Sequence, residues 1–254
     1  MRFSSLGSGS KGNATLVQTG EAMVMVDCGF SLRQTELRLE QLGTKAMNLD
    51  AILVTHEHSD HSKGVAALSR KYQIPVYLTH GTLASGRLDD CSDNCLFATD
   101  KSFAIKDLEV QPVAVPHDAR EPSQFVMHSA GSSLGILTDL GKVTSWVEQC
   151  YAQCDALVLE FNHDTDLLWQ GNYPPALKRR VAGDWGHLNN NQAAALLERV
   201  DQAKLQHLVV AHVSEANNET DKVAESLTRV LGGLESVVWA TQATGYNWLQ
   251  IDPR

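Results

Sequence analysis

One stretch decides the fold of this chain: Ala51-Ile52-Leu53-Val54-Thr55-His56-Glu57-His58-Ser59-Asp60-His61. Its first four residues are apolar and predict a buried strand. Three histidines and an aspartate follow within six residues, although the whole chain holds only 10 histidines. Neutral imidazole and carboxylate groups are the usual ligands of zinc and similar divalent ions. The stretch therefore predicts a metal site where a strand ends, and a solvated polar turn is the weaker interpretation.

The composition of the 254 residues is that of an ordinary globular protein with enough apolar residues for a large core. The first residues lack the apolar segment of a secretory signal, and no apolar run is long enough to span a membrane. The 5 cysteines, an odd number, indicate free and partly buried thiols rather than a disulfide framework or a second zinc site. We therefore expect a cytoplasmic protein that does not bind membranes.

The formal net charge of −9 argues against a broad basic surface that binds nucleic acid along its length. A nucleic-acid substrate is still compatible with this charge, because two bound divalent ions would add positive charge at one place. Lys178-Arg179-Arg180 forms a local basic cluster. A solvated helix face is the simpler interpretation of this cluster, and a phosphate-binding site is the alternative.

The order of the predicted elements indicates an α+β fold. Strands dominate the first part of each half of the chain, and helices alternate with strands later. This order is expected for two mixed β-sheets packed face to face with helices outside. No repeat or linker divides the chain, so residues 1–254 are predicted to form a single domain. The predicted strands are 2–6, 14–18, 23–26, 51–54, 76–79, 103–105, 108–115, 124–128, 133–138, 156–159, 207–210 and 236–239, and the predicted helices are 32–42, 65–72, 143–151, 192–200 and 221–231.

Further candidate ligands stand at the ends of other predicted strands. Asp27, His117, Asp139 and His212 each follow an apolar strand. Singly, a histidine or aspartate in that setting is more often a turn former or a satisfied core residue. Strand ends at one edge of a sandwich converge in space, however, so the four residues and the histidine stretch together predict one shared site.

This ordered set resembles the five motifs of the metallo-β-lactamase-fold superfamily, and the resemblance runs from Asp27 to His212. It implies a four-layer αββα sandwich with the site along one rim, and two divalent metal ions per chain, which could be Zn²⁺, Mn²⁺ or Fe²⁺. By the resemblance, the first metal is held by His56, His58, His117 and Asp139, and the second by Asp60, His61, Asp139 and His212. Asp27 would orient these ligands from behind.

Three differences between this sequence and known branches of the superfamily narrow the choice of branch. His58 stands where flavodiiron proteins have a glutamate, so a redox di-iron centre is not expected. True β-lactamases lack the bridging aspartate represented here by Asp139. Residues 140–211 are too few for the inserted domain of the β-CASP nucleases, so no such insertion is expected.

Five segments resemble the YycJ/WalJ/VicX-like subfamily more closely: 7–13, 116–119, 160–164, 186–190 and 212–218. Asn189 departs mildly from this subfamily, which usually has serine there. Members are described as metal-dependent hydrolases, and some as 5′→3′ DNA exonucleases. The candidates for contacts to ligands or substrate in these segments are Lys11, Asn162, Asn190 and Asn217.

The loop 7–13 lacks the spacing of a P-loop and joins two predicted strands rather than a strand and a helix. Two interpretations remain open. The loop is either a tight hairpin turn or a contact to substrate phosphate through backbone N–H groups and Lys11.

The favoured hypothesis is a dinuclear-metal hydrolase that cleaves phosphodiester bonds of nucleic acid through a hydroxide bridging the two ions, as a 5′→3′ DNA exonuclease does. Asp139 would bridge the ions, Asp60 would orient the nucleophile, and His187 or His163, both in polar loops, would protonate the leaving oxygen. His80 and His128 are predicted to be structural. The alternatives are a hydrolase of a small-molecule phosphodiester, lactone or thioester on the same site, and a metal-binding regulatory or scaffold protein without turnover. A homo-oligomer is left open.

Overall fold

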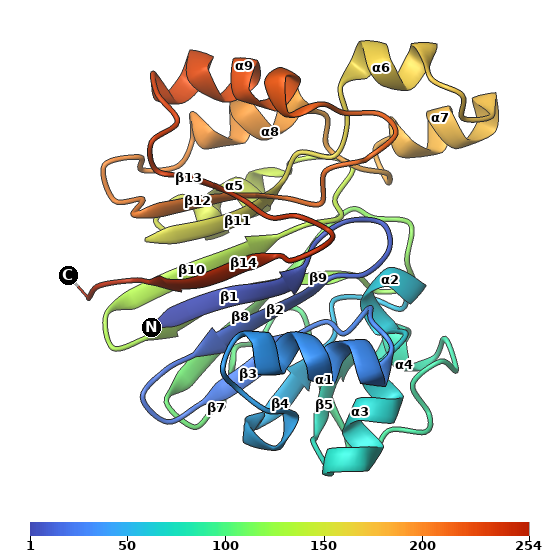
Figure 1. The fold of residues 1–254 in the computed structure, drawn as a ribbon, viewed down its shortest axis with the longest axis vertical. Coiled ribbons are helices and arrows are strands. Elements are labelled where there is room, and N and C mark those ends of the chain that lie inside the picture. Colours follow the sequence, from blue (N-terminus) through green and yellow to red (C-terminus); the bar gives the residue numbers. More distant parts are fainter. Residues whose placement is uncertain (254) are drawn as a thin grey trace.

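The computed structural model describes residues 1–253, and their strands form two β-sheets that pack face to face (Figure 1). The first sheet contains, in spatial order, β14 (Tyr246–Gln250), β1 (Arg2–Gly7), β2 (Ala14–Gln18), β3 (Met23–Val26), β4 (Ala51–Leu53), β5 (Val76–Thr79) and β6 (Asn94–Phe97). The second sheet contains β13 (Val237–Trp239), β12 (His207–Ala211), β11 (Ala156–Glu160), β10 (Ser132–Leu137), β9 (Ser123–Ser129), β8 (Leu108–Ala114) and β7 (Phe103–Ile105).

Both sheets are mixed, as predicted, and both change direction in the same manner. In the first sheet, neighbours from β14 to β3 are antiparallel and neighbours from β3 to β6 are parallel. In the second sheet, neighbours from β7 to β10 are antiparallel and neighbours from β10 to β13 are parallel. Parallel strands bring their carboxyl ends to one edge of a sheet, which is where open α/β sheets bind ligands.

Helices cover the outer face of each sheet, so the predicted αββα sandwich is confirmed (Figure 1). The first sheet is covered by α1 (Leu32–Gln41) and α3 (Val65–Tyr72), and the second by α5 (Ser145–Tyr151), α8 (Asn190–Leu197) and α9 (Thr220–Leu231). The shorter elements are η1 (Ala46–Asn48), α2 (Ser59–Ser62), α4 (His80–Leu83), α6 (Thr165–Gln170) and α7 (Pro175–Val181).

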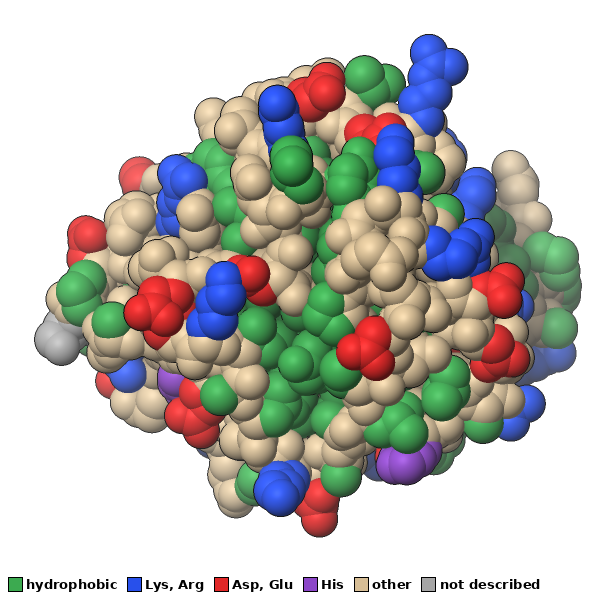
Figure 2. Space-filling model, turned by 90° about the horizontal axis from the view of Figure 1, so that it is seen from below, with side chains coloured by type: hydrophobic (Ala, Val, Ile, Leu, Met, Phe, Trp, Pro, Cys, Tyr) green, Lys and Arg blue, Asp and Glu red, His purple; other side chains and the backbone are tan. Residues whose placement is uncertain are grey.

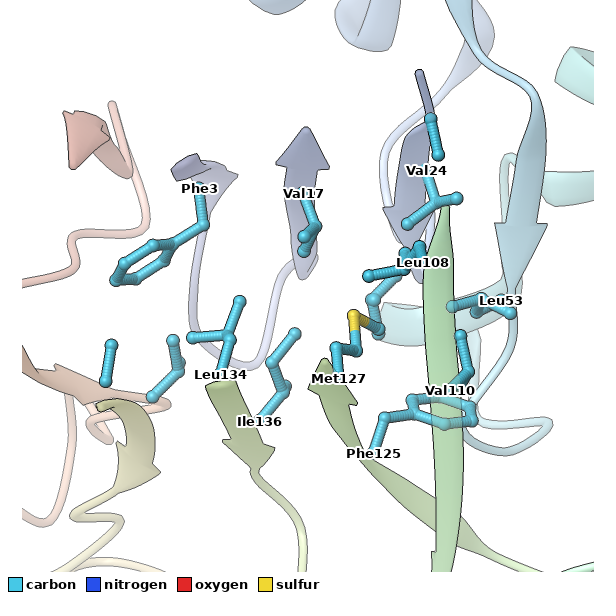
Figure 3. Packing of buried hydrophobic residues seen from close by; sticks show 14 of the residues in the cluster. Phe3, Val17, Val24, Leu53, Leu108, Val110, Phe125, Met127, Leu134 and Ile136 are labelled. Carbon is cyan, nitrogen blue, oxygen red and sulfur yellow. The ribbon is translucent and has the colours of Figure 1, made fainter. Parts of the chain in front are cut away.

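Alternating side chains of each strand supply the apolar layers. In β10, Leu134 and Ile136 enter the central layer between the sheets, whereas Leu137 joins the layer under the helices (Figure 3). Gly135 faces outwards, where a Cβ atom would lie 2.6 Å from the Tyr151 ring. The absent side chain lets Tyr151 lie against the strand and donate its hydroxyl hydrogen bond to the Ile136 carbonyl (2.9 Å). The sheets are therefore buried on both faces, as their apolar sequences require.

Several elements differ from the sequence prediction. The edge strands β6 and β14 and the short helices α2, α4, α6 and α7 were not predicted. These pieces are too short, or too poor in apolar residues, to show a clear period. Helix α8 begins at Asn190 rather than at residue 192, because Asn189 and Gln192 form a capping box that extends the helix towards its amino end.

The surface agrees with the acidic composition. Figure 2 shows acidic and basic side chains interspersed around a central group of apolar side chains, without an extended basic area on that face of the described residues. Within residues 1–253, no helix combines the length and the apolar character needed to cross a membrane. The five cysteines in this range are free, as predicted, and Cys28 and Cys154 are buried.

The central layer gives a test of the packing. Leu134 is fully buried, whereas the Leu37 side chain on α1 is 50% exposed. We expect Leu134→Ala to lower the free energy of unfolding by about 2–5 kcal/mol, because it removes buried methyl groups and leaves a cavity. The matched change Leu37→Ala should cost less than about 0.5 kcal/mol. Equal urea midpoints for the two variants would contradict this layer assignment.

Candidate metal centre

Strand ends from both sheets meet at one edge of the sandwich. Strand β8 is antiparallel to β9, which is antiparallel to β10, so β8 and β10 run in the same direction. Their carboxyl ends therefore share an edge with those of β11 and β12. Strand β9 runs the other way, and this places His128 at the opposite edge, paired with Ser133 near the start of β10. Topology alone thus separates His128 from the site.

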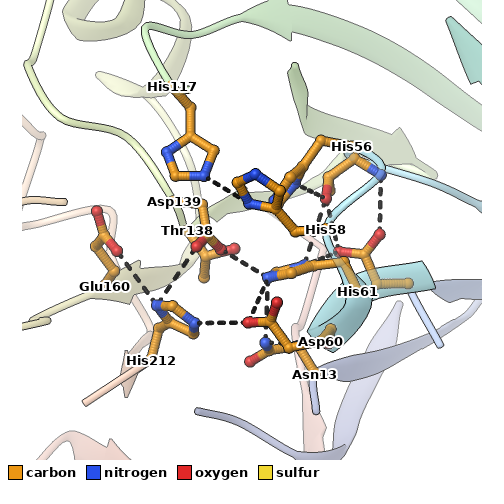
Figure 4. A network of polar contacts seen from close by, with 12 residues as sticks. Asn13, His56, His58, Asp60, His61, His117, Thr138, Asp139, Glu160 and His212 are labelled. Atoms are coloured by element: carbon orange, nitrogen blue, oxygen red, sulfur yellow. Dashed lines mark hydrogen bonds and ion pairs between the residues drawn. The ribbon is translucent and has the colours of Figure 1, made fainter. Parts of the chain in front are cut away.

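The structure brings the seven residues predicted as metal ligands together (Figure 4). They form overlapping groups in which the potential ligand atoms lie within 4.8 Å of one another. The groups are His56, His58 and His117; Asp60, His61 and His212; His56, His61 and Asp139; and Asp139, Glu160, His187 and His212. Asp139 occurs in two of these groups and so connects the histidine loop of the first sheet with the strand ends of the second.

The first group contains ring nitrogens that have no proton or no hydrogen-bond partner. His117 donates from Nδ1 to the Gly186 carbonyl (3.0 Å), which leaves its Nε2 without a proton in the neutral ring. That Nε2 lies 3.3 Å from Nδ1 of His58, and Nε2 of His56 is buried without a hydrogen-bond partner. Burial and the neighbouring His61 hold the pKa of His56 well below its usual value. Neutral imidazoles converging in this way fit a divalent cation.

Asp27 orients two of these histidines. Its Oδ2 accepts a hydrogen bond from Nδ1 of His61 (2.8 Å) and another from the Thr55 hydroxyl (2.8 Å). Since the single hydroxyl hydrogen of Thr55 points to Asp27, the Thr55 oxygen accepts from Nδ1 of His56 (2.9 Å). Nε2 of both histidines is thereby left free to face the centre of the site.

The second group is a set of buried opposite charges. Nε2 of His61 lies 3.0 Å from Asp139 Oδ2 and 3.5 Å from Asp60 Oδ2. Burial alone would lower the pKa of His61, but the carboxylates of Asp139 and Asp27 raise it well above its usual value. Burial likewise opposes ionisation of His212, whose pKa is nevertheless raised to about 10 by Asp139, Asp60 and Glu160. A cation bound here would replace protons that the carboxylates otherwise hold on the imidazoles.

The backbone is strained at three of the site residues. Asp27, Asp139 and His212 have φ angles of 60°, 55° and 51°, in the left-handed region that side chains other than glycine rarely adopt. Each such residue costs about 1–3 kcal/mol and persists only where its surroundings fix it. The His212 amide, for example, donates to the Ser8 hydroxyl (2.8 Å). Strain of this kind concentrates at functional sites.

Glu160 is a buried site residue that the sequence prediction did not assign. Its Oε1 accepts from the amides of Leu140 (3.0 Å) and Leu188 (2.9 Å), and its Oε2 lies 3.1 Å from Nδ1 of His187. Burial opposes ionisation, but His187 and His212 lower the pKa of Glu160 to about 2. The signal was present in the sequence, because Glu160 directly continues the apolar residues 156–159, just as Asp27 continues its strand.

The two candidate proton donors occupy different places. The His187 side chain is 20% exposed and lies 3.1 Å from Glu160 and 3.5 Å from Asp139. His163 is buried, and its Nδ1 lies 3.4 Å from the amide oxygen of Asn162. Among the described residues, only His187 of this pair belongs to a group of potential metal ligands.

The remaining candidates lie around the centre rather than within it. Asn162 contacts His212 through its side-chain amide, which donates to the His212 carbonyl (3.2 Å). Asn190 exchanges hydrogen bonds with the side chain of Asn218 (2.9 and 2.8 Å) and so joins α8 to the loop before α9. Asn217 contacts Ser214 (3.4 Å). These contacts position loops that carry site residues.

The loop 7–13 is a hairpin connection, since β1 and β2 are antiparallel with Gly7 opposite Ala14. The amides of Gly9, Lys11 and Gly12 already donate to acceptors within the protein. The Lys11 ammonium group pairs with Glu215 (2.6 Å). Asn13, in contrast, lies beside the centre, with its side-chain nitrogen 3.2 Å from Nε2 of His61. The hairpin interpretation is therefore the better of the two.

Comparisons with known proteins agree with this geometry. Residues 23–212 match the beta-lactamase superfamily domain, a range that includes every predicted metal ligand. The chain is 36% identical over 239 residues to exodeoxyribonuclease YycJ of Bacillus anthracis, covering 91% of this chain and 89% of that protein. It is 33% identical to exodeoxyribonuclease WalJ of Streptococcus pneumoniae, covering 85% and 83%. The metallo-beta-lactamase fold protein YhfI of Bacillus subtilis superimposes with a TM-score of 0.76 at 16% identity, over 98% of both chains.

Asp27→Asn tests the orienting role of this carboxylate. The amide keeps the size of the side chain but cannot accept both hydrogen bonds that Oδ2 receives, so His61 loses its fixed orientation. We expect the affinity for Zn²⁺ or Mn²⁺, measured by competition with a chelator, to fall about 10- to 100-fold. The control is Asp155→Asn, since Asp155 is a buried aspartate directly before β11 that accepts from Ser133 (2.6 Å). Equal metal affinities for both variants would refute the assignment.

Proposed function

The chain belongs to the metallo-β-lactamase-fold superfamily and is a hydrolase of that superfamily, and from this premise we propose that it degrades DNA as a 5′→3′ exonuclease. The observation that carries the proposal is the convergence of seven potential metal ligands at one rim. The substrate class is supported by the names of the two exodeoxyribonucleases, which match most of this chain. We further propose that residues 1–254 form one domain and that the protein acts in the cytoplasm. Whether it forms a homo-oligomer stays a prediction.

Two divalent ions fit the donor set. His56, His58, His117 and Asp139 would hold the first ion, and Asp60, His61, Asp139 and His212 the second, with zinc, manganese and iron all compatible with these ligands. Bound ions of this kind lower the pKa of coordinated water towards neutrality and neutralise charge on a phosphoryl group.

The chain's own residues supply orientation and proton transfer. The Asp60 side chain is 23% exposed, and its Oδ2 lies 3.7 Å from His212 Nε2 and 3.5 Å from His61 Nε2. Burial opposes its ionisation, but these two histidines keep the pKa of Asp60 below the usual value. An ionised Asp60 at the open side of the centre can accept a hydrogen bond from the attacking water and align it with the phosphorus atom.

Glu160 and His187 form a carboxylate–imidazole pair suited to the leaving group. The carboxylate accepts from Nδ1 of His187 and so fixes the orientation of the ring. When Nε2 of His187 also carries a proton, the ring can donate it to the leaving oxygen as the phosphorus–oxygen bond breaks. The attacking water then forms the new bond to phosphorus and gives its own proton to the Asp60 carboxylate. His163 lacks a contact of this kind among the described residues, so we assign the proton donation to His187 and keep His163 as the alternative.

His187→Gln is expected to lower kcat on DNA about 10²- to 10⁴-fold, because the leaving alkoxide then departs without a proton. The loss on bis-p-nitrophenyl phosphate should be much smaller, since p-nitrophenolate is stable as an anion. His163→Gln is the matched variant, and His80→Gln, on the surface at α4, is the control. The same pattern at His163 with little change at His187 would reverse the assignment.

The function itself is tested on DNA with defined ends. Metal-loaded protein should shorten 3′-labelled, 5′-phosphorylated oligonucleotides progressively, and EDTA should stop the reaction. Asp139→Asn, prepared in parallel, excludes a contaminating nuclease. The net charge of −9 favours the small-substrate alternative, and hydrolysis of bis-p-nitrophenyl phosphate without attack on DNA would establish it. Full metal content without hydrolysis of any ester would instead indicate a regulatory or scaffold protein.

A further inference from the structure

Helix α7 is unusual because it contributes no buried residue to the fold. It carries Lys178, Arg179 and Arg180 and no acidic residue, although the whole chain has a net charge of −9. A cation in the last turn stabilises a helix through its dipole, but α9 has Arg229 alone in that position. Stability therefore does not account for three adjacent cations on a helix that packs so little.

The basic cluster, residues 178–180, is connected to the candidate metal centre by one ion pair. Arg180 donates from Nε to the carboxylate of Asp118. The other oxygen of Asp118 lies 3.5 Å from Nε2 of His117 and 3.8 Å from Nε2 of His58. Within residues 1–253, Lys178 and Arg179 form no ion pair, and the Lys178 ammonium group donates to the Trp169 carbonyl (2.7 Å). Both side chains therefore keep a net positive charge that a ligand can use. In Figure 1, α6 and α7 stand at the upper right, on the same side of the molecule as α2.

Trp185 lies beside this cluster on a loop that is hydrogen-bonded to the end of α7. The loop is closed by hydrogen bonds from the His187 amide to Val181 (2.9 Å) and from the Gly186 amide to Gly183 (2.8 Å). A Cβ atom on Gly186 would lie 2.2 Å from the backbone oxygen of Arg180, so the loop is pressed against α7. Trp185 is nevertheless 63% exposed. A large aromatic ring held outwards on a fixed backbone suits stacking against a planar ligand.

We propose that α7 and Trp185 bind a single-stranded segment of DNA as it enters the metal centre. Lys178 and Arg179 neutralise its phosphates, and Trp185 stacks on an unpaired base. Cations that follow a backbone beside an aromatic ring are the general means of binding single strands. Bases inside a duplex are already stacked and cannot use the ring. This inference rests on the proposed function and deepens it, because it names the strand form of the substrate.

The test measures binding without turnover. Metal-loaded, full-length protein is titrated against a fluorescent phosphorothioate-linked oligothymidylate, which resists hydrolysis, and anisotropy gives the Kd. Trp185→Ala should raise the Kd about 5- to 150-fold, the range for one lost stacking contact. Arg179→Ala should weaken binding and reduce the slope of log Kd against log salt concentration by about 0.7. Trp185→Phe should restore most of the affinity, since it keeps an aromatic face.

Two controls match the variants in exposure. Trp146 on α5 is 48% exposed, and the Arg229 side chain in the last turn of α9 is 59% exposed. Trp146→Ala and Arg229→Ala should leave the Kd and its salt dependence within about twofold of the unmodified protein, as expected of surface changes. Circular dichroism verifies that all four alanine variants are folded.

Each outcome decides between the two proposals. Unmodified protein that degrades DNA, with Trp185→Ala and Arg179→Ala binding as tightly as the controls, overturns the assignment of α7 and leaves the proposed function in place. Tighter binding of a duplex, unaffected by Trp185→Ala, overturns the single-strand assignment. Unmodified protein that neither binds the oligonucleotide nor degrades DNA overturns both.

Discussion

The arrangement of the site depends on the contacts that the Asp139 carboxylate makes with histidines from both sheets. It lies 3.0 Å from His61, which belongs to the loop after the first sheet's β4, and 3.6 Å from His212 at the end of the second sheet's β12. It is 2% exposed and held in a left-handed conformation directly after β10. A buried carboxylate is tolerated only where cationic partners surround it. The two sheets must therefore pack in the one register that brings both histidines to this group.

The need for cationic partners around buried carboxylates also explains why so many residues surround the site. Four carboxylates, those of Asp27, Asp60, Asp139 and Glu160, surround the histidines, and their mutual repulsion must be offset by protons or cations. Ring nitrogens that do not face the centre are held by other groups of the protein, as His117 is by the Gly186 carbonyl and His61 is by Asp27. Side chains held in this way favour metal affinity, because little order must be created on binding.

The sequence predicted which side chains would meet at one rim, because each of them follows a strand and strand direction determines which edge it reaches. Sequence alone could not separate His187 from His163, since both lie in polar loops and only the contact of His187 with Glu160 distinguishes them. Helix α7 showed no apolar period, because none of its residues is buried. Strand β14 pairs with β1 from the other end of the chain, a contact that no local pattern encodes.

Local pairing, rather than net charge, determines where this acidic protein can accept a polyanion. At physiological ionic strength, charges more than about 8 Å apart are largely screened in water, so most of the acidic surface does not act at the rim. In the sequence, Lys11 and the α7 cluster are both candidate phosphate contacts, although a solvated helix face is the simpler interpretation of the cluster. In the structure, Lys11 is paired with Glu215 at 2.6 Å. Arg180 is likewise paired with Asp118, and this pair holds α7 beside the predicted metal ligand His117. Lys178 and Arg179 keep their charge, so the attraction for phosphate is concentrated on the helix that adjoins the centre.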